Sequence, residues 1–131
     1  MHAQNDRKQL LILESLPGAY SLHKLETDSE IPEITVGFYS VTRTSEEISI
    51  VCIDESEIDS ISCSKGWKGF KVSGTLELDL VGILHRLTLP LKEVGIPVYA
   101  ISTFNTDYLF VPGHSCKEAI KALSEGFVVK G

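Results

Sequence analysis

The residues best suited to covalent chemistry are a cysteine and a histidine near the C-terminus. Cys116 follows His114 by two positions at the expected start of a helix, where a thiolate would be stabilised. The three cysteines include no CxxC pair, and the chain has no GxSxG, HExxH or Walker sequence. A cysteine and a histidine without an orienting third group do not make a catalytic set. We therefore expect no catalytic residue, no metal site and no cofactor, and a small Cys/His enzyme is the least favoured alternative.

Basic and aromatic side chains alternate in a second segment, KGWKGFK, at residues 65–71. Such interleaving occurs on surfaces that stack nucleic-acid bases. The chain as a whole has 12 Lys and Arg against 18 Asp and Glu, a formal charge of −6, which repels phosphate backbones. A strand with solvated lysines is therefore the favoured interpretation. We expect no nucleic-acid partner and no membrane partner, and a cytoplasmic location, because no apolar run is long enough to span a bilayer.

The elements that would position such groups recur along the chain. The segment YSVTRTSEEISIV, residues 39–51, aligns without a gap with YAISTFNTDYLFV, residues 99–111, at an offset of sixty positions. Both segments have a hairpin pattern, and Glu47 falls on Asp107. The repeat divides the 131 residues into two small units, which we place at residues 1–62 and 63–131.

The second half predicts the order strand, helix, strand, strand, helix, strand. Leucines and Val94 at steps of three and four indicate an amphipathic helix that begins at Asp79 as N-cap. Gly95 ends this helix, and Ser115 with Glu118 predicts a capping box for the next one. The expected strands cover residues 70–73, 96–103, 107–111 and 127–129.

The first half follows the same order less fully. Residues 10–13 predict a strand, and residues 38–43 with 48–53 predict a hairpin, whereas residues 17–36 contain two prolines and do not accommodate a long helix. Residues 54–61 form at best a short acidic helix. The predicted fold class is α+β, with two ferredoxin-like (βαββαβ) units of which the first is degenerate. Units this small have marginal cores, so we expect them to pack as a pseudo-duplicate.

The segment GTLELDLVGILHRLTLPLKEVGIPVYAISTFNTDYLFVPGHSCKEAIKAL resembles an ACT domain, a regulatory module that binds small molecules. Its part ISTFNTDYLFV is similar to the hairpin of aspartokinase regulatory domains and of the cytosolic arginine-sensor (CASTOR) family. LLILESLPGAYSLHKL and FYSVTRTSEEISIVC resemble the degenerate first repeat of those sensors. The resemblance implies a non-catalytic tandem ACT protein that binds an amino acid for regulation and forms a homodimer. An interaction module without a ligand is the alternative.

The resemblance also implies a ligand site between ACT units, made by a helix N-terminus and a hairpin edge. Free amides at a helix N-terminus suit an α-carboxylate, and a carboxylate beside the hairpin suits an amino or guanidinium group. Asp107 has an equally weighted alternative role as a cap of its own turn, and Gly74 and Gly82 are favoured as residues of loop geometry and packing. The expected site residues are Ser73, Gly74, Thr75, Leu76, Asp79, Gly82, Ile101, Thr103, Asn105 and Asp107.

Overall fold

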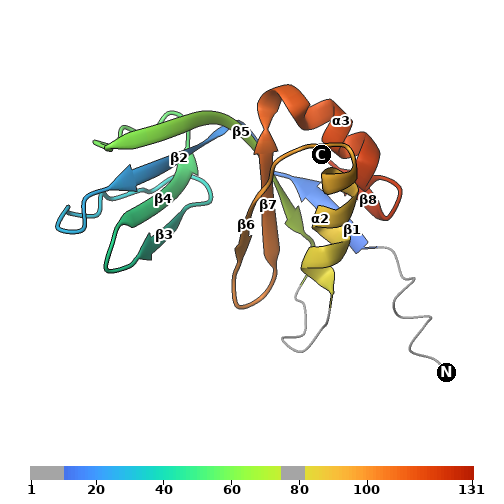
Figure 1. Cartoon of the computed structure of the whole chain (residues 1–131), viewed down its shortest axis with the longest axis horizontal. Coiled ribbons are helices and arrows are strands. Elements are labelled where there is room, and N and C mark those ends of the chain that lie inside the picture. Colours follow the sequence, from blue (N-terminus) through green and yellow to red (C-terminus); the bar gives the residue numbers. More distant parts are fainter. Residues whose placement is uncertain (1–10, 75–81) are drawn as a thin grey trace. The chain divides into compact units, whose positions relative to one another are not determined.

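The computed structural model describes residues 11–74 and 82–131, which form a mixed sheet and two α-helices (Figure 1). This architecture confirms the predicted α+β class. Neither described helix has the length and apolarity needed to cross a bilayer. The strands are β1 (Leu11–Ser15), β2 (Tyr20–Leu25), β3 (Ser40–Arg43), β4 (Ile48–Ile53), β5 (Ser62–Val72), β6 (Tyr99–Ser102), β7 (Asp107–Pro112) and β8 (Phe127–Lys130), and the helices are α2 (Ile83–Glu93), the 3-10 helix η1 (Gly113–Ser115) and α3 (Cys116–Leu123).

The chain forms two compact units, one of which is inserted into the sequence of the other. One unit, called the helical unit, joins the described residues up to Leu16 with residues 69–131, and the other, called the strand unit, comprises residues 17–68. This division differs from the predicted one at residues 62/63, because β1 pairs with β5 and β8 and so completes the C-terminal unit. Strand β5 contributes its first residues to the strand unit and its last four to the helical unit.

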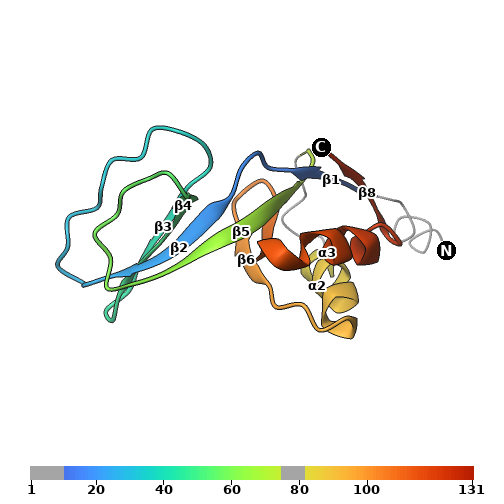
Figure 2. The same ribbon diagram turned by 90° about the horizontal axis from the view of Figure 1, so that it is seen from above.

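The helical unit has the predicted order β5, α2, β6, β7, α3, β8. Its strands lie in the order β6, β7, β5, β1, β8, so β1 is an additional strand between β5 and β8. Strand β1 runs antiparallel to β5 and parallel to β8. The two helices lie next to each other, as Figure 2 shows. A βαββαβ unit with one inserted strand is therefore the fold of this part of the chain.

Both helices of the helical unit cover one face of its sheet. Leu87 and Leu91 of α2 and Leu123 of α3 are fully buried in one apolar cluster. Every second residue of the facing strands joins the cluster, as expected for strands with one buried face. The sheet residues in this cluster are Leu13, Phe70, Val72, Leu109, Val111 and Phe127.

The glycine that follows α2 ends this helix as predicted. Gly95 has a φ of 74° and its N–H donates to Lys92 O at 3.0 Å, while Ile96 N–H donates to Leu91 O at 2.9 Å. These two bonds form a Schellman motif, and Ile96 and Leu91 meet in the core. At the other end, Gly82 is the N-cap with a φ of 88°. The predicted N-cap, Asp79, lies outside the described residues.

The predicted capping box before α3 is wrong. Ser115 precedes the helix but its side chain makes no cap hydrogen bond. The reason is the 3-10 turn of residues 113–115, which gives Ser115 φ −104° and ψ 5° instead of the extended conformation that an N-cap requires. The N–H of Cys116 donates to Gly113 O, which closes the 3-10 turn before α3.

The strand unit is an antiparallel sheet in the order β3, β4, β2, β5. Residues 65–71 belong to β5, which agrees with the strand interpretation of this basic and aromatic segment. Between Tyr20 and Leu22, the register of β2 against β5 shifts, because Lys65 and Gly66 stand opposite one residue of β2. Gly66 has a φ of 79°, a conformation that glycine adopts at little cost in such a bulge.

Two expectations for the strand unit are corrected. Strand β2 was not predicted, because its buried face is Ser21, His23 and Leu25, and two polar residues obscure the alternation. The short acidic helix expected at residues 54–61 is a turn followed by an irregular segment. Its start is held by Ser21, whose hydroxyl donates to Asp54 Oδ1, and by Asp54 N–H, which donates to Ala19 O at 2.9 Å.

The two hairpins of the repeat share the same turn at an offset of 59, not sixty. Thr44 hydroxyl donates to Glu47 O at 3.4 Å, and Thr103 hydroxyl donates to Thr106 O at 3.0 Å. The backbone N–H of each threonine donates to the same carbonyl, at 2.9 and 2.8 Å. Glu47 therefore corresponds to Thr106, and the predicted match of Glu47 with Asp107 is wrong by one residue.

Candidate small-molecule site

Three of the expected site residues line one cavity in the helical unit. Gly74, Thr103 and Asn105 surround a space of about 280 Å³ together with three residues that the expectation did not include. This volume is close to the lower limit of roughly 300 Å³ for small-ligand sites. The three further residues are Lys71, Thr106 and Tyr108.

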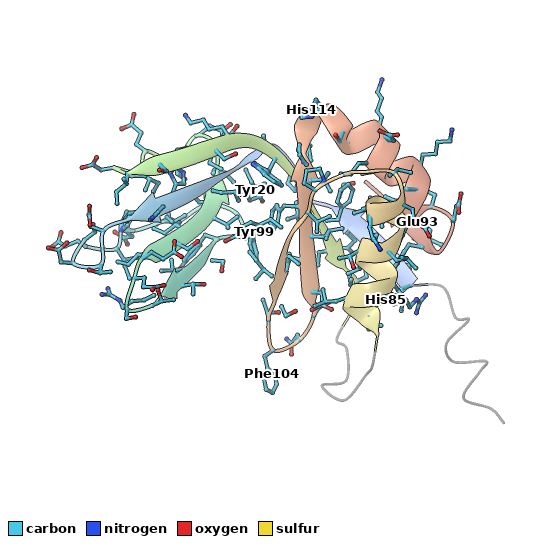
Figure 3. All side chains as sticks on the ribbon, viewed as in Figure 1. Tyr20, His85, Glu93, Tyr99, Phe104 and His114 are labelled. Atoms are coloured by element: carbon cyan, nitrogen blue, oxygen red, sulfur yellow. The ribbon has the colours of Figure 1, made fainter. Side chains whose placement is uncertain are left out.

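The hairpin between β6 and β7 is held in place against β5. Thr106 is buried, and its hydroxyl donates to Val72 O at 2.7 Å. Its backbone N–H donates to Thr103 Oγ1 at 3.3 Å, so one threonine closes the turn and the other ties the turn to the sheet. Phe104 projects from the tip and is 77% exposed (Figure 3). The wall of the cavity is thus built on a fixed backbone.

Lys71 is the only charged side chain on the described cavity wall. It lies in the middle of the C-terminal part of β5 and opposite Glu14 of β1. Phe70 and Val72 point into the helix-covered core, so alternation directs Lys71 to the other face, which Tyr108 shares. A lysine ammonium among polar groups makes the cavity suited to an anion such as a carboxylate. Sequence reasoning considered Lys71 only within the basic segment, although its position two residues before Ser73 was a usable signal.

Asp107 and Ile101 do not line this cavity among the residues described. Asp107 Oδ1 accepts a hydrogen bond from Ser102 Oγ at 2.6 Å, across the first pair of the β6–β7 ladder. Asp107 precedes Tyr108 in the strand, so the two side chains point to opposite faces. The side chain of Thr103, and not that of Asp107, forms hydrogen bonds within the turn. Ile101 of β6 is paired with Tyr108 of β7.

The residues expected from the loop before α2 are only partly described. Ser73 N–H donates to Ile12 O at 2.8 Å, and Ser73 Oγ is buried without a hydrogen-bond partner in the part of the chain that is described. Thr75, Leu76 and Asp79 lie outside the described residues. Gly82 caps α2, and the first turn of this helix has no acidic residue.

The cysteine and histidine near α3 are placed apart from this cavity wall. Cys116 is partly buried and packs against the core of the helical unit. His114 is exposed, and Figure 3 shows it at the start of the α3 region. Within residues 11–74 and 82–131, no group of three or more His, Cys, Asp or Glu side chains converges as a metal ion would require.

Comparison with known proteins gives one family match for each half of the chain. The family model described as an ACT domain matches residues 62–125, and a second model, described as an N-terminal domain, matches residues 18–63. The two matches meet near the predicted boundary at residues 62/63, although β1 joins the helical unit in space. Residues 62–125 therefore match the ACT domain family, which places this domain in the C-terminal half of the chain.

Solved structures share the fold of almost the whole chain. A structural-genomics protein from Agobacterium tumefaciens is 30% identical, with 94% of this chain and 95% of that chain covered and a TM-score of 0.86. A Vibrio cholerae protein described as a possible transport protein is 18% identical, with 88% of each chain covered and a TM-score of 0.63. Aspartate kinase from Clostridium acetobutylicum, an allosteric enzyme, is 14% identical with a TM-score of 0.65. The match covers 88% of this chain but 34% of the kinase, and at such identity the likeness concerns the fold.

Proposed function

We propose that the protein is a non-catalytic regulatory protein that binds a free amino acid in the cavity of the helical unit. The observation that carries the proposal is Lys71, the one cation among the described residues of a small polar wall formed by β5 and the β6–β7 turn. The match of residues 62–125 to the ACT domain family and the likeness in fold to an allosteric aspartate kinase support a regulatory role.

The chemistry of the wall assigns a part of the ligand to each residue. The ammonium of Lys71 pairs with the α-carboxylate, in a charge-assisted hydrogen bond. The side-chain carbonyl of Asn105 and the hydroxyl of Thr103 accept from the α-amino group. Gly74 has a φ of 85°, and a Cβ at this position would meet no atom of the described residues within 4 Å, so a ligand can approach its backbone closely. Asp107 is outside this wall, so the proposal carries no preference for a basic amino acid.

The direct test is a thermal-shift screen of the standard amino acids followed by calorimetric titration of each hit. Lys71→Met should weaken binding of the hit by about tenfold or more, because a charge-assisted bond is worth roughly 1.5–3 kcal/mol. Lys92→Met is the matched control, since Lys92 is exposed on α2 and lines no described cavity. If no amino acid raises the melting temperature, or if Lys71→Met and Lys92→Met bind the amino acid with the same affinity, the proposal is wrong.

An assembly module is the second candidate, and one apolar pair favours it. Ile12 and Val128 stand side by side in the β1–β8 register and are 37% and 40% exposed. A second copy of the chain would cover these side chains in a homodimer. Light scattering tests this directly: a dimer that Val128→Lys dissociates supports assembly, and a monomer of 14.4 kDa at all concentrations refutes it.

A further inference from the structure

The strand unit contains a second and larger cavity, of about 710 Å³. Its floor is formed by β2 and the first part of β5, and the irregular segment after β4 forms its other side. All lining residues belong to the strand unit, so this cavity is separate in sequence from the one that contains Lys71. The lining residues are His23, Asp54, Glu55, Ser56, Glu57, Ile58, Asp59, Ser60, Cys63 and Lys65.

One side chain of this lining is buried with an unused hydrogen-bonding atom. His23 is 5% exposed, and its Nδ1 lies 3.1 Å from Ser60 Oγ. Its Nε2 is buried and has no hydrogen-bond partner in the described part of the chain. Native proteins satisfy nearly all buried polar atoms, and an orphaned one is explained by a missing partner or a function. A ligand in the cavity would supply that partner.

The backbone holds the imidazole of His23 in a fixed position. His23 pairs with Ile50 of β4 on one side and with Cys63 of β5 on the other, so it belongs to a central strand. Its neighbours on the same face, Ser21 and Leu25, are also buried. The ring therefore faces the cavity without the freedom to turn out into solvent, which lowers the entropy cost of binding.

The charges of the lining select the sign of a ligand. Four carboxylates, from Asp54, Glu55, Glu57 and Asp59, face one ammonium, from Lys65. Burial and then the charge of Lys65 lower the pKa of His23, while Asp54 acts in the opposite direction, and the lowered pKa favours the neutral imidazole. A cation gains from this excess of negative charge. A metal ion is disfavoured, because the described acidic, thiol and imidazole groups do not converge in threes.

We propose that this cavity binds a small organic cation, with a primary ammonium or a guanidinium group whose N–H donates to His23 Nε2. In this arrangement His23 Nδ1–H donates to Ser60 Oγ, which leaves the lone pair of Nε2 directed to the ligand. The carboxylates of Glu57 and Asp59 surround the positive charge of the ligand. The site is independent of the amino-acid site proposed for the helical unit.

Calorimetric titration of the full chain with agmatine and cadaverine tests this proposal. The charge-reversed probe is glutarate, which has the same carbon-chain length as cadaverine but carries two carboxylates. At least one of the two cations should bind and glutarate should not. Binding of glutarate as tight as that of both cations, or no binding of either cation, would overturn the proposal.

Variants then locate the bound cation. His23→Phe keeps a planar ring without an acceptor and should weaken binding about tenfold, with His85→Phe on the exposed face of α2 as the control (Figure 3). The double variant Glu57→Gln, Asp59→Asn changes only exposed side chains, so it tests the site even if His23→Phe impairs folding. Its expected effect is also about tenfold, and Glu30→Gln should have none. Affinity unchanged in the double variant, or His23-dependent binding of Zn²⁺ in place of the amines, would refute the assignment.

Discussion

The helical unit and the strand unit share a hairpin with the same threonine turn, but their sheets are covered in different ways. In the helical unit, α2 and α3 seal one face over a cluster of eleven buried residues, whereas the corresponding cluster described in the strand unit has four. An irregular segment takes the place of helices there, with Ile58 as its apolar contact. A helix satisfies its own backbone while it covers a sheet, but an irregular segment does not. The second kind of cover leaves polar groups and space beside the sheet, and the His23 cavity is the result.

The largest expected effect comes from the cover of the helical unit. Leu91→Ala should lower the free energy of unfolding by about 2–5 kcal/mol, because Leu91 is fully buried and the cavity left behind cannot collapse. Ile58→Ala in the cover of the strand unit should cost clearly less, since Ile58 is only partly buried. Urea unfolding followed by circular dichroism measures both. Equal losses would show that the two covers contribute alike and would remove the contrast.

A glycine in β5 tests how closely the helical unit is packed. A Cβ at Gly69 would lie 2.6 Å from Phe110 Cε2 and 2.9 Å from Leu16 Cδ1, so Gly69→Ala should cost about 1–3 kcal/mol of stability. Gly126→Ala is the matched control, because nothing lies within 4 Å of its Cβ position. Melting temperatures of the two variants give the comparison. If Gly69→Ala has the same melting temperature as the wild-type protein, Phe110 and Leu16 can move aside without cost.

The buried threonine of the second hairpin has a smaller expected effect. Thr106→Val removes the hydroxyl that donates to Val72 O and should cost about 1–2 kcal/mol, since this carbonyl loses its buried donor. Thr88→Val removes a hydroxyl bond to Leu84 O that is exposed to water, and we expect almost no loss. At the corresponding place in the first hairpin stands Glu47, which has no hydroxyl. If Thr106→Val and Thr88→Val are equally stable, the hydrogen bond between Thr106 and Val72 does not hold the turn of the site in place.

The smallest effect is the pH dependence of stability that His23 contributes in the strand unit. Burial and Lys65 keep the pKa of folded His23 below its ordinary value of 6.5. As the pH falls below about 6.5, His23 is protonated in the unfolded chain but still neutral in the folded chain. The free energy of unfolding therefore decreases until the pH is below the folded-state pKa of His23. Chemical unfolding between about pH 5 and pH 7 measures this slope. His23→Phe should flatten it, whereas an unchanged slope would assign the dependence to other groups.

Much of the helical unit could be predicted because its signals are local. The stripe of leucines, the glycine after α2 and the hairpin pattern each depend on neighbouring residues, and the order of elements followed from them. Strand β1 joins a unit that begins more than fifty residues later, and such pairing leaves no local signal. The offset of the repeat was wrong by one because side-chain identity, and not the hydrogen bonds of Thr44 and Thr103, determined the alignment.

The candidate sites were predictable only in part, for two physical reasons. Asn105 and Thr103 are on the turn where a ligand site was expected, but alternation along β7 directs Asp107 away from the wall that Lys71 and Tyr108 form. His23 was given no role from the sequence, because the segment around it indicates no regular structure and a histidine in a strand of mixed polarity has no pattern of its own. The role proposed for His23 depends on the burial of its side chain and on an Nε2 atom without a described hydrogen-bond partner, which are properties of the folded chain.

The central claim is that the helical unit binds an amino acid at the wall formed by β5 and the β6–β7 turn. Two-dimensional amide NMR during titration with the best-stabilising amino acid tests this claim directly. We predict saturable shifts of the backbone amide signals of Lys71, Gly74, Thr103 and Asn105. The amide signals of residues 17–61, the part of the strand unit before β5, should not shift, and Lys71→Met should show no shifts at the first four positions. Shifts that are absent from these residues at saturation, or that persist in Lys71→Met, would contradict the account.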